Sequence, residues 1–306
     1  MSTPPKYDAQ KFKALIDSAL EADQGARFAR LLGEELRYCE ALKSRPSDPS
    51  YIGGAYVGAG AAGKKCGRAI WYDFRWASRK VFSAKSLRIF NAGQLQETRI
   101  GAQLRLAFDE TLWLRDEEGR QFSKVVDGLI KSKLDGVIEL DGIPHVLEIK
   151  SAGKNFGDLA DDGVRYAKPD HYVQMQLGVW AFDLPRACYV AVEKMTDDLY
   201  VEIIDRDDDA IGRSIARVHA ITHADAVPPR IPLASPSFYE CKLCDHKSVC
   251  YGGNVPAPNA RACRTCAVFT IREHGTPWCT LSHDRPIKDL SSQHRGCPAH
   301  TLMVLE

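Results

Sequence analysis

The chain has almost no net charge and no long apolar segment. Its 306 residues include 41 Lys and Arg against 40 Asp and Glu, a formal net charge of +1, so the overall charge does not indicate a nucleic-acid or membrane-surface partner. Because no apolar run is long enough to cross a bilayer and no secretory signal is present, we expect a cytoplasmic protein without a membrane partner. Hydrophobic residues make up 44% of the chain, which is enough for one large core with small appendages.

The sequence also lacks internal repeats of roughly 20 to 50 residues and low-complexity tracts. A complete phosphate-binding loop is missing too. Residues 58–65 read GAGAAGKK, but Lys65 stands where the motif G-x-x-x-x-G-K-[ST] needs a hydroxyl for Mg²⁺. No apolar strand clearly precedes this segment and no second acidic motif follows it. We interpret it as a basic turn leading to Cys66, not as a nucleotide-hydrolysing site.

Residues 134–150, LDGVIELDGIPHVLEIK, form the most informative segment that is present. Apolar residues on both sides of Asp141-Gly142 predict two antiparallel strands joined by a tight turn. Since side chains on a strand alternate between its faces, Glu148 and Lys150 should project from the same face. An exposed hairpin with ordinary salt bridges is the alternative, because Asp-Gly turns and E-x-K triplets are common on solvated strands.

The same hairpin offers oxygen ligands for a hard cation. Asp135, Glu148 and the backbone carbonyl of Ile149 can bind Mg²⁺ or Mn²⁺, while the Lys150 ammonium can hold or activate an attacking water. These residue types in this order are those of a metal-dependent phosphodiesterase.

Helices and strands are expected around the hairpin. Residues 88–105 predict an amphipathic helix that carries Glu97. Residues 169–182 predict a largely apolar helix after Pro169, with Asp170 as a candidate N-cap and with two glutamines. Residues 187–194 and 199–204 predict a pair of strands.

This order of elements and motifs resembles the PD-(D/E)XK nuclease superfamily over about residues 50–255. It is most similar to the RecB-like branch, which includes lambda-type phage exonucleases and CRISPR-associated spacer-acquisition nucleases. The resemblance implies an α/β restriction-endonuclease-like core, a mixed sheet flanked by helices. The residues that it implies for metal binding and catalysis are Glu97, Asp135, Glu148, Ile149, Lys150 and Gln174, with Gln176 as the alternative glutamine. The chain departs from the motif at Leu134, which replaces the proline.

The implied activity is Mg²⁺- or Mn²⁺-dependent hydrolysis of DNA, most readily as an exonuclease in phage or bacterial recombination or repair. Single-stranded DNA or duplex ends would be its substrate, a single-strand annealing or recombination protein could be its partner, and an oligomer is compatible with the sequence. A non-catalytic DNA-binding scaffold and a restriction-type endonuclease are the alternatives.

Ten cysteines in a chain without a signal peptide favour metal binding over disulfides. Cys241, Cys244 and Cys250 supply three thiolates at C-x2-C-x5-C spacing. The resemblance implies Cys66 as the fourth ligand of a [4Fe-4S] cluster that clamps the core. Zinc is the alternative metal, with His246 available inside the run.

A second cysteine set follows the Pro-containing segment PAPNA. Because so short a piece of chain cannot bury enough apolar surface alone, a structural zinc is expected to stabilise it. The predicted ligands are Cys263, Cys266, Cys279 and Cys297, with His283 and His300 as spare donors. A disordered tail is the alternative. The predicted domains are therefore a helical region at 1–50, the nuclease core at 51–255 and a zinc module at 256–306.

Two further segments are candidates for DNA contacts. Residues 64–80 interleave basic and aromatic residues, so Arg68 and Arg75 could bind phosphates, although the aromatics could equally belong to the core. The Gly- and Asp-rich residues 151–170 predict a mobile loop at the active-site mouth, where Lys154 and Arg165 could touch phosphate. Residues 8–43 predict two helices broken near EADQG.

Overall fold

A computed structural model describes residues 5–39, 55–78, 83–153, 156–252, 261–281, 284–287 and 289–303. The chain forms two compact units, each built from separate segments. The first, here called the sheet unit, comprises Met1–Arg45, Phe82–Lys124 and Ser132–Ile211. The second, here called the cysteine unit, comprises Pro46–Val81, Val125–Lys131 and Gly212–Glu306. Residues 51–255, predicted as one nuclease core, therefore contribute to both units, and the predicted boundaries near 50 and 255 lie outside the described residues.

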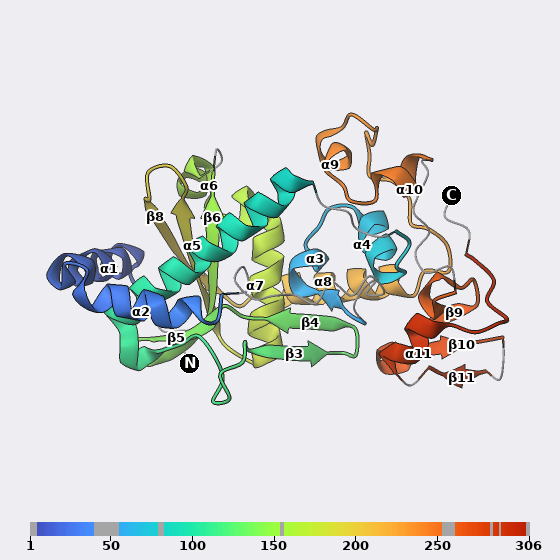
Figure 1. Ribbon diagram of the computed structural model, residues 1–306, viewed down its shortest axis with the longest axis horizontal. Helices are drawn as coiled ribbons and strands as arrows, with labels where there is room; N and C mark the ends of the chain where they lie inside the picture. Colours follow the sequence, from blue (N-terminus) through green and yellow to red (C-terminus); the bar gives the residue numbers. More distant parts are fainter. Residues whose placement is uncertain are drawn as a thin grey trace. The chain divides into compact units, whose positions relative to one another are not determined.

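The sheet unit is built on a five-stranded mixed sheet (Figure 1). Its strand order is β2 (Leu112–Trp113), β5 (Gly136–Leu140), β6 (Ile143–Ala152), β7 (Arg186–Glu193) and β8 (Leu199–Asp205). β6 and β7 pair in parallel, and the other neighbours pair antiparallel. A parallel pair needs a crossover connection, which α6 (Gly157–Ala167) and α7 (Pro169–Phe182) supply. The result is a mixed α/β architecture with a mixed sheet flanked by helices.

The predicted hairpin is confirmed as β5 and β6. Its turn residues Asp141 and Gly142 have φ values of 50° and 74°, which is the backbone of a tight hairpin turn and favours Gly at the second position. In β5, Gly136, Ile138 and Leu140 are buried and the residues between them are not. Since β6 lies in the middle of the sheet, its residues 145–149 are all buried.

Three helices cover one region of this sheet. α1 (Ala9–Asp23) and α2 (Ala26–Leu36) pack on α5 (Ala84–Phe108), which lies against β6 (Figure 1). The break predicted near EADQG falls at Gln24 and Gly25, which both adopt left-handed backbone conformations. The core beneath these helices joins α1, α5 and the sheet; its residues include Phe12, Ile16, Ile100, Leu104, Ile138, Leu147 and Val190.

The loop predicted for residues 151–170 is mostly regular structure. β6 continues to Ala152 and α6 begins at Gly157. The helix is broken at Gly163, which has φ 70°, and the Val164 N–H then donates to Glu202 at 2.7 Å. The Gly and Asp content therefore marks a kinked helix instead of a mobile loop. Asp170 is not the N-cap of α7, because Pro169 already occupies the first helical position, where its missing N–H has no intrahelical partner to lose.

The cysteine unit consists of short elements. Its strand β1 (Val57–Gly58) pairs in parallel with β4 (Ile130–Lys133), beside β3 (Ser123–Val126). A second sheet has the antiparallel order β11 (Arg285–Pro286), β10 (Thr276–Cys279) and β9 (Phe269–Arg272). The helices are α3 (Ala59–Ala62), α4 (Gly67–Phe74), α9 (Tyr239–Lys242), α10 (Lys247–Tyr251) and α11 (Leu290–Arg295), together with α8 (Asp208–Thr222) from Gly212 onward. The 3₁₀ turns are η2 (Asp109–Thr111, in the sheet unit), η3 (Cys263–Thr265) and η4 (Glu273–Gly275).

The aromatic residues of α4 and its end belong to the core of this unit. Each is at most 3% exposed; they are Trp71, Tyr72, Phe74 and Trp76. Arg264 crosses them, with its guanidinium 4.2 Å from the Phe74 ring, and donates to the carbonyls of Phe74 and Ala55 and to Gln293. The C-terminal segment thus packs directly on α4. In the described part of the chain, no helix is long and apolar enough to cross a membrane.

Candidate active site

The β5–β6 hairpin carries a carboxylate just before its first strand and an ion pair on its second strand. Asp135 directly precedes β5, and its Oδ2 accepts a hydrogen bond from the Ile149 N–H of β6 at 2.8 Å. On the same strand the Lys150 ammonium pairs with the Glu148 carboxylate. This ion pair confirms that the two side chains share a face, as the E-x-K spacing predicts.

Glu97 joins this group from α5. Burial and, after it, the negative charge of Asp135 raise the pKa of Glu97 to about 8, while Lys150 acts in the opposite direction. Asp135 is also a hydrogen-bond partner of Glu97. Four predicted residues, Glu97, Asp135, Glu148 and Lys150, are therefore brought together from a helix and two strands of the sheet unit.

Three carboxylates surround one ammonium in this group. Burial raises the pKa of Glu148 to about 7, opposed by Lys150 and reinforced by Asp135. Burial alone would lower the pKa of Lys150, but the charges of Glu148, Asp135 and Glu97 outweigh it and raise the pKa above its ordinary value. The ammonium is thus held firmly in its charged form, and two negative charges remain uncompensated when all three acids are ionised.

The donor set fits a divalent cation. Carboxylate oxygens are the ligands that Mg²⁺ and Mn²⁺ prefer, and a second positive group would relieve the repulsion that raises the pKa of Glu97 and Glu148. As the side chains stand, no group of three or more His, Cys, Asp or Glu residues within the described ranges is placed to hold a metal ion. The Lys150 ammonium pairs with Oε1 of the Glu148 carboxylate, so a bound cation would share this carboxylate with Lys150.

A cleft of about 570 Å³ opens on these residues. Glu97, Asp135 and Ile149 line it together with three basic residues that the sequence did not single out, namely Arg115, Arg120 and Lys133. The sequence gives only weak evidence that these three residues belong to a site, since basic residues on connecting segments are common. Arg115 is fixed by an ion pair with the buried Glu35 at 2.7 Å, and its guanidinium lies 3.8 Å from the Tyr38 ring.

The two glutamines of α7 differ in their surroundings. Gln176 is buried; its Nε2 donates to the Asp205 carbonyl at 2.9 Å, and its Oε1 accepts from the Asp207 N–H at 2.8 Å. It therefore ties α7 to the end of β8. Gln174 is partly exposed, and among the described residues no hydrogen bond joins it to the four clustered side chains.

A histidine and a tyrosine beside the cluster were missed by the sequence reasoning. Tyr189 of β7 is the register partner of Glu148, and its hydroxyl lies 2.9 Å from the Nδ1 of His171 on α7. Burial lowers the pKa of His171 to about 4, with Asp170 opposing and Lys150 contributing. The parallel pairing of two strands far apart in the sequence creates this neighbourhood, which local patterns cannot predict.

The structure gives two of the predicted DNA-binding arginines a different role. Arg75 is 3% exposed, and its guanidinium donates to the carbonyls of Arg264, Cys266 and Phe269. Arg68 is 9% exposed and donates to the Pro228 carbonyl at 2.7 Å. Both are occupied inside the cysteine unit, because a buried guanidinium must satisfy its donors, and neither can reach a phosphate in this arrangement.

The other two predicted contacts lie in the region between β6 and α7. Arg165 is exposed and pairs with Asp207 at 3.2 Å. Lys154 lies outside the described residues.

The first cysteine set gathers around α9 and α10. Burial raises the pKa of the Cys244 thiol, and the charge of Cys66 adds to this shift. The Tyr251 hydroxyl donates to the Cys241 sulfur at 3.4 Å, and the charge of Cys250 also acts on Tyr251. All four predicted cysteines therefore lie in one neighbourhood of the cysteine unit.

Cationic side chains face this set. The Nε of Arg230 lies 3.4 Å from the Cys250 sulfur, and Nη1 of Arg68 lies 3.9 Å from the same sulfur. The alternative ligand His246 is 2% exposed; its Nδ1 lies 2.7 Å from the Ser78 hydroxyl, and its Nε2 lies 3.1 Å from a carboxylate oxygen of Asp73 without forming a hydrogen bond.

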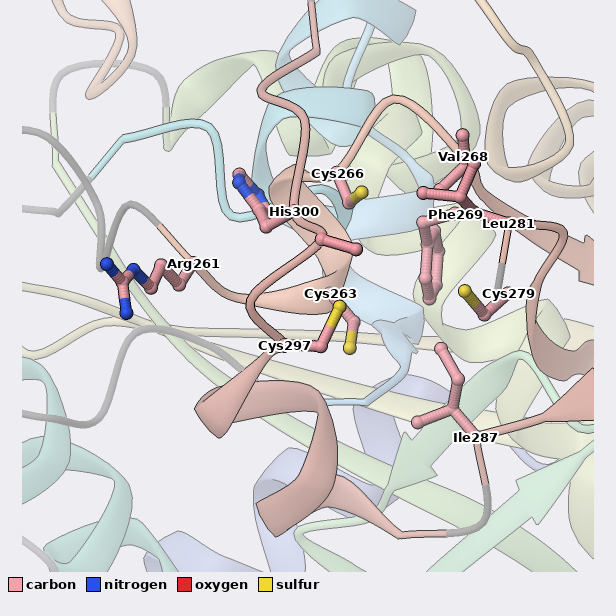
Figure 2. A pocket seen from close by; sticks show the side chains of 11 residues that line it. Arg261, Cys263, Cys266, Val268, Phe269, Cys279, Leu281, Ile287, Cys297 and His300 are labelled. Carbon is pink, nitrogen blue, oxygen red and sulfur yellow. The ribbon is translucent and has the colours of Figure 1, made fainter. Parts of the chain in front are cut away.

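The second cysteine set lines one small pocket of about 20 Å³ (Figure 2). The four residues are Cys263, Cys266, Cys279 and Cys297. Burial raises the pKa of Cys263 to about 11, and the charges of Cys297, Cys279 and Cys266 add to the shift. The spare donor His300 has its Nε2 3.0 Å from the Thr265 hydroxyl, whereas His283 lies outside the described residues.

The segment that resembles a phosphate-binding loop, residues 58–65, accepts hydrogen bonds through its backbone carbonyls. Arg217 of α8 donates to the carbonyls of Ala62, Lys64 and Lys65 at 2.6–3.0 Å. A phosphate-binding loop instead directs its N–H groups toward the ligand. This geometry agrees with the interpretation of residues 58–65 as a turn leading to Cys66.

No family model matches the chain, and no curated protein matches its sequence. Among solved structures, SSO0001 is 20% identical with a TM-score of 0.40, covering 74% of this chain and 97% of its own. LHK-Exo, an alkaline exonuclease from Laribacter hongkongensis, is 16% identical with a TM-score of 0.40, over 55% of this chain and 86% of its own. A phage-related exonuclease from Haemophilus somnus 129PT is 18% identical with a TM-score of 0.30, over 41% of this chain and 69% of its own. These values are too low to transfer an activity.

Proposed function

We propose that the sheet unit hydrolyses DNA phosphodiester bonds in a reaction that depends on Mg²⁺ or Mn²⁺. The observation that carries the proposal is the convergence of Glu97, Asp135, Glu148 and Lys150. Two of them, Glu97 and Asp135, line a cleft that also carries basic side chains. Acidic residues that bind a metal beside cationic residues that bind phosphates are the parts this reaction requires.

Each residue has a proposed task. Asp135, Glu148 and the Ile149 carbonyl would hold the metal, and Glu97 would complete its ligands or hold a second ion. When bound, the metal lowers the pKa of water and offsets charge on the phosphate. Lys150, kept charged by its carboxylate neighbours, would position the attacking water, and Gln174 would orient a ligand or the phosphate. Arg115, Arg120 and Lys133 replace Arg68 and Arg75 as proposed phosphate contacts, while Lys154 and Arg165 stay predictions.

Substitution of the cluster tests this proposal. Asp135→Ala and Lys150→Ala should each lower the rate of Mn²⁺- or Mg²⁺-dependent cleavage of labelled DNA by on the order of 10³-fold. Glu139→Gln is the matched control, because Glu139 is a partly exposed carboxylate of the same hairpin outside the cluster. Near wild-type cleavage by Lys150→Ala would refute its role. A wild-type protein that binds DNA and cleaves none with either metal would favour the non-catalytic scaffold.

The motif resemblance makes digestion from DNA ends, in phage or bacterial recombination or repair, the form of the activity to test first. A circular and a linear DNA of the same sequence separate the possibilities. An exonuclease should degrade only the linear form, whereas a restriction-type endonuclease should cut both. A recombination partner and an oligomeric state also stay predictions.

We also propose that the two cysteine sets hold different metals. Cys66, Cys241, Cys244 and Cys250 would bind a [4Fe-4S] cluster, a proposal supported by their shared neighbourhood. Anaerobic purification followed by an absorption spectrum and iron and sulfide analysis tests it. Cys66→Ser should lose the iron, and zinc in place of iron would refute the cluster.

The second set would bind one structural Zn²⁺ through Cys263, Cys266, Cys279 and Cys297. The shared pocket supports this ligand set, and the contact between His300 and Thr265 favours Cys297 as the fourth ligand. Cys297→Ser should lower the zinc content by about one ion per chain, while His300→Ala should leave it unchanged. The opposite pattern would make His300 the ligand.

A further inference from the structure

The end of α2 forms part of the wall of the cleft that Glu97 and Asp135 line. Glu35, near the end of the helix, and Tyr38, just after it, line the same cleft. Glu35 is only 3% exposed, and a buried carboxylate must be paired with positive groups to stay charged. The partners of Glu35 therefore show what this part of the N-terminal segment contributes to the cleft.

Two arginines pair with Glu35. Nη1 of Arg105, on α5, lies 2.8 Å from its Oε1, and Nη2 of Arg115 lies 2.7 Å from its Oε2. Each carboxylate oxygen thus binds a different arginine. Arg105 also pairs with the neighbouring Glu34 at 3.0 Å, whereas Glu35 is the ion-pair partner of Arg115 within the described ranges. Glu35 therefore connects the packing of α2 on α5 to a basic residue of the cleft.

Tyr38 fixes the Arg115 guanidinium from a second direction. The Cζ of Arg115 lies 3.8 Å from the centroid of the Tyr38 ring, within the range of a cation–π contact. A guanidinium has five N–H donors in a planar fork, and among the described residues only the Glu35 carboxylate accepts from it. The side chain is 23% exposed and lines the cleft. Its remaining donors are therefore available to two oxygens of one phosphate, the group that such a fork matches.

Arg115 differs in this respect from the other basic residues of the cleft. Arg120 is 70% exposed and pairs with Asp116 and Glu118 of its own turn, and Lys133 is exposed. Neither is fixed by a buried group. A long, mobile side chain loses rotational freedom when it binds a ligand, which weakens binding. Arg115 has already lost this freedom, because a buried carboxylate and a ring fix it.

We propose that Glu35 and Tyr38 are positioning residues, which fix Arg115 so that its remaining donors bind a phosphate of the DNA in the cleft. This inference rests on the proposed nuclease function and gives the N-terminal helices a part in substrate binding. The sign of the effect separates this role from a simple charge effect. A carboxylate that acted only through its charge would repel DNA, and its removal would strengthen binding. Loss of a carboxylate that acts through Arg115 weakens binding instead.

The experiment measures DNA binding by fluorescence anisotropy without divalent metal, so that no cleavage occurs. The probes are a labelled DNA strand and the duplex of the same sequence, because both present phosphates. Arg115→Ala should weaken binding of both by roughly 10-fold or more, the loss of one charge-assisted contact. Glu35→Gln should weaken binding of both by roughly 2- to 10-fold, because Arg115 must then be ordered when DNA binds. Unchanged or tighter binding by Glu35→Gln would overturn the proposal.

Glu34→Gln is the matched control for Glu35→Gln. Glu34 is the preceding residue of the same helix and pairs with Arg105 but not with Arg115, so its substitution should not weaken binding. An equal loss in Glu34→Gln would mean that both glutamates act only by holding α2 on α5, and the positioning role would be wrong.

Two variants of Tyr38 test the ring without disturbing a buried charge. Tyr38 is 42% exposed, so substitutions there should leave the fold intact. Tyr38→Phe keeps the ring and should bind DNA like the wild type, whereas Tyr38→Leu should weaken binding. Wild-type binding by Tyr38→Leu would overturn the role of the ring. Circular dichroism verifies that each variant keeps its helix content.

A double substitution tests whether Glu35 acts through Arg115. If it does, adding Glu35→Gln to Arg115→Ala should cause no further loss of affinity, because the side chain that Glu35 positions is already absent. A further loss as large as that in the single variant would mean that Glu35 acts independently, and would overturn the proposal.

Failure of this inference can be told apart from failure of the nuclease function. Hydrolysis of bis(p-nitrophenyl) phosphate by the wild-type protein with Mn²⁺ reports on the catalytic cluster without DNA binding. Hydrolysis together with unaltered DNA binding by Glu35→Gln would refute the positioning role alone. A wild-type protein that hydrolyses neither this ester nor DNA, while Glu35→Gln weakens DNA binding as expected, would refute the nuclease function and support the positioning of Arg115.

Discussion

Glu97, Glu148 and Lys150 show how strongly a buried site can change the ionisation of single residues. Burial disfavours the charged form of each group, and the neighbouring charges then decide the outcome. The two glutamates hold protons more tightly than usual, whereas the lysine is kept charged. A carboxylate with a raised pKa in the folded state makes the protein less stable as the pH rises, because only the unfolded chain can ionise freely.

We expect this effect to be measurable for Glu97 in metal-free protein. Its pKa is about 8 when folded and 4.5 ordinarily, so the folded state binds more protons between these values and the free energy of unfolding falls as the pH rises through them. The loss should reach at most about 5 kcal/mol. Denaturant unfolding of the wild type and Glu97→Gln between pH 5 and about 8.5 measures the difference in their free energies of unfolding. The variant should become increasingly more stable than the wild type as the pH rises.

Added Mn²⁺ provides the control for this prediction. A bound cation stabilises ionised Glu97, so the pH dependence of the wild type should flatten while that of Glu97→Gln changes less. A difference between the two proteins that is constant across the pH range would contradict the assigned burial and charge environment of Glu97.

The glutamines of α7 give a second prediction about single residues. Gln176→Leu leaves the Asp205 carbonyl and the Asp207 N–H without the partners they have in the fold, which should cost about 1–3 kcal/mol of stability. Gln174→Leu removes a partly exposed side chain and should cost under about 1 kcal/mol, while lowering the cleavage rate if it orients the active site. Urea unfolding and a DNA cleavage assay on both variants separate the two roles. Equal stability losses would contradict this assignment.

At the scale of elements, local patterns predicted most of the sheet unit. The Asp141-Gly142 turn, the two apolar strands around it and the helix carrying Glu97 are encoded by neighbouring residues, and all three are present. The prediction failed for residues 151–170, because the break at Gly163 is stabilised by Glu202 of a distant strand. It failed for Arg75 because its acceptors lie near residue 264. In both cases the structure depends on contacts between distant segments of the chain, which local sequence patterns cannot predict.

α4 also depends on a contact with a distant segment. Arg264 is 1% exposed, and burial, then the nearby charge of Arg75, lower its pKa to about 9. Arg264→Met would leave the carbonyls of Phe74 and Ala55 and the Gln293 amide oxygen without their donor. We expect a loss of about 3–5 kcal/mol in the stability of the cysteine unit. Arg285→Met, which removes an exposed arginine of the same unit, should cost under about 0.5 kcal/mol. Similar denaturation midpoints for the two variants would contradict the role of Arg264.

At the scale of the whole molecule, the candidate catalytic residues and the cysteine sets lie in different units. All four clustered catalytic candidates lie in the sheet unit, and both cysteine sets lie in the cysteine unit. The C-terminal segment was predicted as a separate zinc module, yet it belongs to the same compact unit as Cys66 and α4. If the two cysteine sets hold the proposed metals, loss of one metal should therefore affect the other, because metal binding and folding are coupled.

Deleting residues 261–306 tests this coupling. The truncation removes the backbone carbonyls that accept from Arg75 and the guanidinium that binds α4, leaving a buried charge without partners next to the helix that begins after Cys66. We expect the truncated protein to lose iron as well as zinc and to lose protease resistance in the cysteine unit. Elemental analysis and limited proteolysis with mass spectrometry measure both losses. The sheet unit contains none of the deleted residues, so its proteolytic fragments should stay protected. A truncated protein that retains its full iron content would mean that the first cysteine set folds without the second, and that the buried arginines stabilise only the C-terminal segment.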